Sequence, residues 1–134
     1  MRSLISLRHV PTYDPQSVLH AMRECLAPWG GMGAFVRPGQ RVRVKPNLLI
    51  GFSPERAVTT HPAVVRAAVL LAQEGGGTVV VEDSPGVGRL ASVVRSAGLI
   101  PGTLKSQWHF RLQRREWLAS RLWPLRRRPE DQRQ

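Results

Sequence analysis

Three consecutive glycines, Gly75 to Gly77, join a helical pattern to a run of β-branched residues, and this junction constrains the fold more than any other stretch. From Pro62 to Glu74, apolar residues occupy almost every side of a helix, and a proline fits in the first turn. Glycine ends a helix readily because it enters the left-handed cap conformation at little cost. The apolar run Thr78–Val81 that follows is typical of a strand buried on both faces of a parallel sheet.

A second strand precedes this helix. Val42 and Val44 are β-branched, and Lys45, Pro46 and Asn47 mark the strand's end because proline cannot donate to the ladder. The stretch 41–86 therefore predicts a strand, a helix and a parallel strand with a right-handed crossover. Ligands of such sheets bind beyond the carboxyl ends of the strands.

Weaker patterns flank this unit. Residues 3–10 alternate loosely and predict a first strand, a helix should run from an Asp14 cap to Pro28, and a last helix should end at Gly98. The predicted fold class is α/β, a three-layer arrangement with a mainly parallel sheet and crossover helices, incomplete at its C-terminal side. The strand near Val79 should be central, since an edge strand would leave the backbone groups along one of its edges unpaired and exposed to water.

Three motifs also match a known family. The runs VKPNLL, AVTTHPAVVRA and EDSPG occur in this order within residues 2–99, which resemble the bacterial and archaeal family called domain of unknown function 362. The resemblance implies an α/β protein of uncertain activity. It also implies that full-length relatives often continue into a ferredoxin-like segment holding a 4Fe-4S cluster. Cys25 is the only cysteine here, so we expect no such cofactor in this chain.

The polar residues at the two strand ends form the candidate ligand site. An ammonium at the rim of a sheet can neutralise a phosphate or carboxylate, and backbone N–H groups that lead into a helix can receive an anion. Glu82 and Asp83 could instead hold a hydroxyl or a hard cation such as magnesium, although no metal site is assigned. A solvated strand end and a chain turn are the structural alternatives. The ligand-binding candidates are Lys45, Asn47, Thr60, His61, Asp83, Ser84 and Gly86.

Two of these candidates begin the central helix. Thr60 is predicted to cap that helix, and His61 could act as a proton shuttle or a metal ligand. By simple connectivity we expect both at the opposite end of the sheet from Lys45, unless the long preceding loop folds back.

The charge of the chain is concentrated towards its C-terminus. The formal net charge is +11, and residues 103–134 hold nine of the 20 Lys and Arg but only three of the nine Asp and Glu. We divide the chain into a partial α/β domain at 1–102 and a basic, Trp- and Arg-rich tail at 103–134. The tail could bind nucleic acid or an anionic membrane. A loosely packed helix from about 106 to 122 is allowed there, and no further strand is expected.

The departure from the family pattern after Leu99 has another explanation, a truncated or frameshifted gene whose product is non-functional. The opening residues resemble no signal peptide, and no run reaches the length of a membrane span, so we expect a cytoplasmic protein. No reaction, substrate or oligomeric state follows from these patterns, and an enzymatic activity is neither predicted nor excluded.

Overall fold

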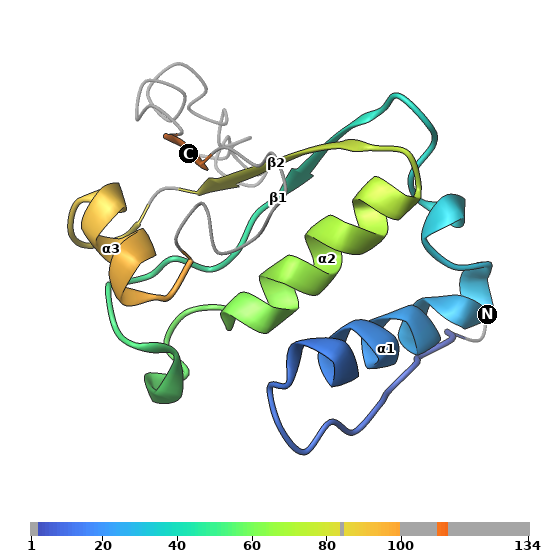
Figure 1. Cartoon of the computed structure of the whole chain (residues 1–134), viewed down its shortest axis with the longest axis horizontal. Helices are drawn as coiled ribbons and strands as arrows, with labels where there is room; N and C mark the ends of the chain where they lie inside the picture. The colour runs from blue at the N-terminus through green and yellow to red at the C-terminus, as the bar shows by residue number, and fades with distance from the viewer. Residues whose placement is uncertain (1–2, 84, 100–109, 113–134) are drawn as a thin grey trace, which may run out of the picture.

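The computed structural model describes residues 3–83 and 85–99, together with the backbone of residues 110–112 (Figure 1). The helices are α1 (Pro15–Leu26), α2 (Pro62–Glu74) and α3 (Leu90–Ser96), and the strands are β1 (Arg41–Val44), β2 (Thr78–Asp83) and β3 (Phe110–Leu112). Short 3-10 turns occupy Ala27–Trp29, Met32–Ala34 and Pro54–Arg56. The chain is a mixed α/β protein, as its sequence predicts.

The sheet is parallel, and β2 lies between β1 and β3. Val42 pairs with Val79 and Val44 with Val81, while Val81 also faces Phe110 on the other flank. The predicted central position of β2 is therefore confirmed. The expectation that no strand follows Leu99 is wrong, and so is a helix through residues 110–112, because β2 offers this segment a free edge to pair with.

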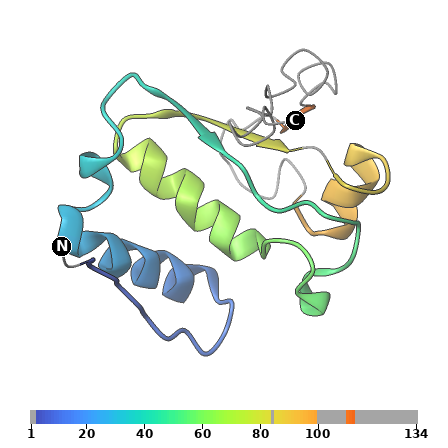
Figure 2. The same cartoon turned by 180° about the vertical axis from the view of Figure 1, so that it is seen from behind.

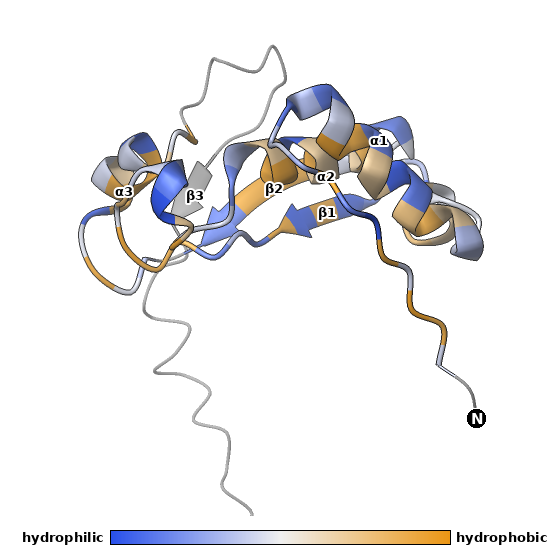
Figure 3. Cartoon of the chain, turned by 90° about the horizontal axis from the view of Figure 1, so that it is seen from below, coloured by the Kyte–Doolittle hydropathy of each residue, from blue (hydrophilic) through white to orange (hydrophobic). Residues whose placement is uncertain are grey.

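α1 and α2 lie on one side of the sheet. α2 contacts both β1 and β2, and α1 packs along α2 on the side away from the strands (Figures 1 and 2). Figure 3 shows α1 and α2 on the same side of the strands. Within the part of the chain that the structure describes, no helix covers the opposite face, so the third layer stays a prediction.

The main core lies between α2 and the sheet. Val65 and Val69 of α2 pack with Val79 and Val81 of β2, all 4% exposed or less. A second, smaller core between α1 and α2 contains Val18, Ala63 and Ala67. α2 is thus covered on two sides, which explains why apolar residues occupy nearly its whole circumference.

The junction between α2 and β2 depends on its glycines. Gly76 has φ +83°, a left-handed conformation that a side chain would strain. A Cβ at Gly77 would lie 2.8 Å from Val42 Cγ2 and 2.9 Å from Val36 Cγ1. A residue without a side chain is therefore needed at Gly77, where the backbone passes directly against Val42 of β1 and Val36.

The N-terminal segment corrects one prediction. Residues 3–10 form no strand, and Arg8 Nε instead meets Glu24 Oε2 of α1 at 3.2 Å. Leu4, Ile5 and Leu7 are exposed. The alternation is real, but no sheet edge lies beside this segment in the described region, and a strand cannot form without a partner. The helix that follows begins as predicted, since Asp14 Oδ2 accepts the Ser17 N–H at 2.8 Å.

In the described residues, the longest helix has 13 residues, and none combines the length and apolarity needed to cross a membrane.

Candidate functional site

The carboxyl ends of β1 and β2 are joined by Asp83. Its Oδ1 lies 3.0 Å from Lys45 Nζ, and its Oδ2 accepts the Leu48 N–H at 2.9 Å. Asp83 is buried, whereas the Lys45 side chain is 64% exposed. Asp83 therefore ties the two strand ends together and holds an accessible ammonium group at the edge of the sheet.

A second ion pair lies beside the first. Arg43 Nε is 2.8 Å from Glu82 Oε2, and the Glu82 side chain is only 9% exposed. The adjacent carboxylates of Glu82 and Asp83 are thus each paired with a basic side chain. No group of three potential His, Cys, Asp or Glu ligands occurs among the described residues, so the hard-cation hypothesis for Glu82 and Asp83 gains no support there.

Asn47 and Thr60 bond to each other across a loop. The Asn47 N–H donates to Thr60 Oγ1 at 2.8 Å, and the Thr60 N–H donates to the Asn47 carbonyl at 3.2 Å. The expectation that Thr60 and His61 lie at the opposite end of the sheet is therefore wrong. A crossover helix runs antiparallel to its strands, so α2 begins where β1 ends and brings Thr60 to the Lys45 edge.

His61, rather than Thr60, caps α2. Its Nδ1 accepts the Ala63 N–H at 3.1 Å, which places the proton of the neutral ring on Nε2. The imidazole stacks on Tyr13, with ring centroids 3.8 Å apart and planes 12° from parallel. Burial lowers the pKa of His61, and the nearby Glu55 carboxylate opposes this shift. The ring is therefore a neutral donor at pH 7.

Gly86 has a packing role. A Cβ there would meet the Leu49 carbonyl oxygen at 3.2 Å, and the next N–H, that of Val87, donates to the same carbonyl at 3.1 Å. The loop after β2 thus closes against the chain after β1. Ser84 lies outside the described residues. Of the sequence-predicted candidates, Lys45 contacts Asp83 and Asn47 contacts Thr60, whereas the His61 ring stacks on Tyr13.

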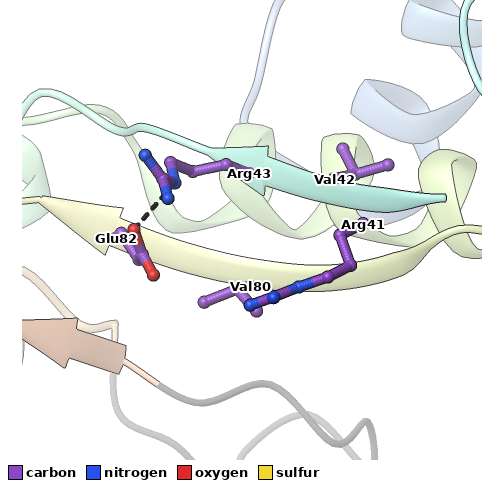
Figure 4. A pocket seen from close by; sticks show the side chains of 5 residues that line it. All are labelled: Arg41, Val42, Arg43, Val80 and Glu82. Atoms are coloured by element: carbon purple, nitrogen blue, oxygen red, sulfur yellow. Dashed lines mark ion pairs between the residues drawn. The ribbon is translucent and has the colours of Figure 1, made fainter.

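Sequence reasoning missed two features. Thr59 is 7% exposed, and its Oγ1 is buried without a hydrogen-bond partner among the described residues. Arg41 and Arg43 line a groove on the sheet face opposite α2 (Figure 4). Their spacing of two residues along a strand was the available signal, because alternate side chains share one face.

Residues 42–101 match the family described as Domain of unknown function (DUF362). This segment is a DUF362 domain. It contains β1 except for Arg41, and all of α2, β2 and α3, and therefore the Lys45 edge of the sheet. The resemblance carried by the three sequence motifs is thus confirmed.

A second comparison found a similar named protein. A protein named thylakoid-associated protein, from Synechocystis sp., is 44% identical over 97 residues. The match covers 72% of this chain but 30% of that relative, so the chain spans less than a third of the relative's length. No solved structure matches the chain.

Proposed function

We propose that this DUF362 domain binds a small anionic ligand, a phosphate or a carboxylate, at the carboxyl edge of its sheet. The observation that carries the proposal is the position of Lys45. An ammonium group has three donors, and Asp83 Oδ1 takes one of them, at 3.0 Å. The same contact fixes the direction of the side chain, so the remaining donors point to solvent at a defined place. Fixed donors bind an anion at a lower entropic cost than a free lysine.

Asn47, two residues beyond Lys45, and Thr60, which is bonded to it, add neutral donors to the proposed site. Asn47 is exposed, and the Thr60 hydroxyl accepts from the Asn47 N–H while keeping its own proton to donate. His61 retains an Nε2–H donor, because its Nδ1 accepts the Ala63 N–H, and its ring stacks on Tyr13. One cation with several neutral donors suits a small ligand of one or two negative charges. A long polyanion would instead need a larger cluster of cations.

The iron–sulfur cluster that the family resemblance implies for full-length relatives is outside this proposal. Such a cluster is held by several cysteine thiolates, and this chain has only Cys25. The residues present do not fit the group. No reaction step of this chain is derived from it.

Thermal denaturation with a panel of phosphates and carboxylates tests the proposal. A ligand at 100 times its Kd should raise the free energy of unfolding by about 2.7 kcal/mol. Lys45→Ala should abolish this gain, while Arg95→Ala, which removes an exposed cation from α3, should retain it. Stabilisation that survives in Lys45→Ala, or is lost equally in both variants, would refute a site at this edge.

Association with an anionic membrane is the second candidate function. The name of the Synechocystis relative favours it, as do the exposed apolar side chains of the N-terminal segment, Leu4, Ile5 and Leu7. Co-sedimentation with phosphatidylglycerol vesicles, weakened by rising salt, is the expected result. The tail proposed to bind membrane or nucleic acid lies outside the described residues, apart from the backbone of residues 110–112. The cytoplasm stays the proposed compartment.

A further inference from the structure

The face of the sheet opposite α2 carries two arginines in a groove. Arg41 and Arg43 alternate with Val42 along β1, so both side chains stand on this face. With Val80 and Glu82 of β2 they line a groove of about 360 Å³ (Figure 4). This volume lies within the range of small-molecule sites.

Glu82 defines the position of one guanidinium. Its carboxylate engages Arg43 through Nε at 2.8 Å, and the Glu82 side chain is 9% exposed, so the ion pair is largely shielded from water on the acidic side. The Nε contact leaves the two Nη groups of Arg43 to other acceptors. The Arg43 side chain itself is 66% exposed and accessible to a ligand.

Arg41 makes no ion pair within the described part of the chain. It is exposed and extends over the surface beside Val80 (Figure 4). Counting Arg41, Arg43 and Glu82, the groove has a formal charge of +1. A cross-strand ion pair alone would need only Arg43 and Glu82. The second arginine therefore supplies positive charge beyond what pairing within the sheet uses.

We propose that Arg41 and Arg43 bind the phosphate group of a small soluble phosphoester in this groove, at a site separate from the Lys45 edge. A guanidinium presents parallel N–H donors that match two phosphate oxygens. Arginines two residues apart on one strand stand about 7 Å apart at their Cα atoms, and their long side chains can converge on one tetrahedral group. Val80 forms an apolar floor between them that a ligand carbon can cover.

Titration with inorganic phosphate and glycerol 3-phosphate tests the site. The Lys45→Ala background is used so that the proposed edge site cannot contribute. In that background, Arg41→Gln should weaken binding of glycerol 3-phosphate by about 10-fold or more, because a charge-assisted contact is lost. Arg41→Lys, which keeps the charge but lacks the planar fork, should weaken it less. Arg37→Gln, at an exposed position just before β1, should leave it unchanged.

Several results would overturn the proposal. Equal affinity in Arg41→Gln and its parent would exclude the groove, and an equal loss in Arg37→Gln would indicate general attraction to positive charge. Binding that disappears with Lys45→Ala alone would place the phosphate at the edge of the sheet. Retention of phosphatidylglycerol vesicles without any binding of the soluble phosphates would replace the soluble phosphoester by a lipid headgroup.

Discussion

At the level of single residues, Asp83 is expected to matter for stability through its backbone contact. Asp83→Ala leaves the buried Leu48 N–H without an acceptor and should cost about 1–3 kcal/mol in the free energy of unfolding. Asp83→Asn keeps an oxygen for that N–H and should cost less than about 1 kcal/mol, as should Lys45→Ala, whose ion pair is largely exposed on the lysine side. Urea denaturation of the three variants measures the differences. A similar cost for Asp83→Asn and Asp83→Ala would show that the charge of Asp83, rather than its hydrogen bond from the Leu48 N–H, stabilises the fold.

His61 should make stability depend on pH. Burial holds its folded-state pKa below the ordinary value of about 6.5, so the unfolded chain binds the proton more readily. The stability that the neutral cap contributes is fully present above that value and is lost as pH falls through the folded-state pKa. His61→Asn supplies a neutral cap at every pH.

The measurement is the thermal midpoint of wild type and His61→Asn between about pH 5 and 8. The difference should be constant above about pH 7 and move in favour of the variant below about pH 6. The other histidines are present in both proteins, so their titration cancels. The shift of Glu55, whose pKa is lowered mainly by a hydrogen bond from Ser53, acts at a lower pH. A constant difference over the whole range would show that His61 does not titrate differently on folding.

The candidate site could be predicted only in part from the sequence. Lys45 and Asp83 were found because each follows an evident strand, and parallel strands end at the same edge. Their mutual ion pair was missed, since sequence gives no register. Thr60 is a better helix cap than His61 by propensity, but the Asn47 backbone uses the Thr60 hydroxyl and N–H, so the imidazole takes the cap.

At the level of elements, the turn from α2 to β2 should tolerate no side chain at its last glycine. Gly77→Ala puts a Cβ within 3 Å of Val42 and Val36 and should destabilise by about 1–3 kcal/mol, the usual cost of overpacking. Gly33→Ala is the matched control, because nothing lies within 4 Å of its Cβ position. Its effect should stay within about 0.5 kcal/mol. Indistinguishable urea midpoints for the two variants would contradict this packing.

Sequence predicted the β1–α2–β2 unit well because each of its boundaries has a local cause. Pro46 ends β1, Pro62 begins α2 and Gly76 ends it, and these residues restrict the backbone wherever they occur. A strand was predicted at residues 3–10 where none forms, and none was predicted where β3 forms. Both errors have the same cause. A strand is stabilised by its neighbour, and alternation within a short segment does not tell whether a neighbouring edge is available.

At the level of the whole molecule, the sheet should need residues beyond Leu99. A chain ending at residue 112 keeps β3 beside β2, whereas a chain ending at 99 removes the backbone pairs of Val81, Glu82 and Asp83 with Phe110–Leu112. We expect the chain ending at 99 to have a free energy of unfolding about 1–3 kcal/mol lower than the chain ending at 112, since each backbone hydrogen bond makes a net contribution of about 0.5–1.5 kcal/mol. Urea denaturation and sedimentation of both chains test this. Equal stability would show that β3 does not support the sheet.

Because β2 is the central strand, its two neighbouring strands become available at different times during translation. β1 precedes β2 in the chain, so β2 can pair with it at once. β3 follows only after α3, so the second edge of β2 can be paired only later. On a ribosome adding about 5–20 residues per second, the second flank of β2 stays without its own partner for a time on the order of seconds. During that interval a strand from a neighbouring nascent chain competes for the same hydrogen bonds. Demand for a chaperone should therefore be greatest while the segment between α3 and β3 is being made.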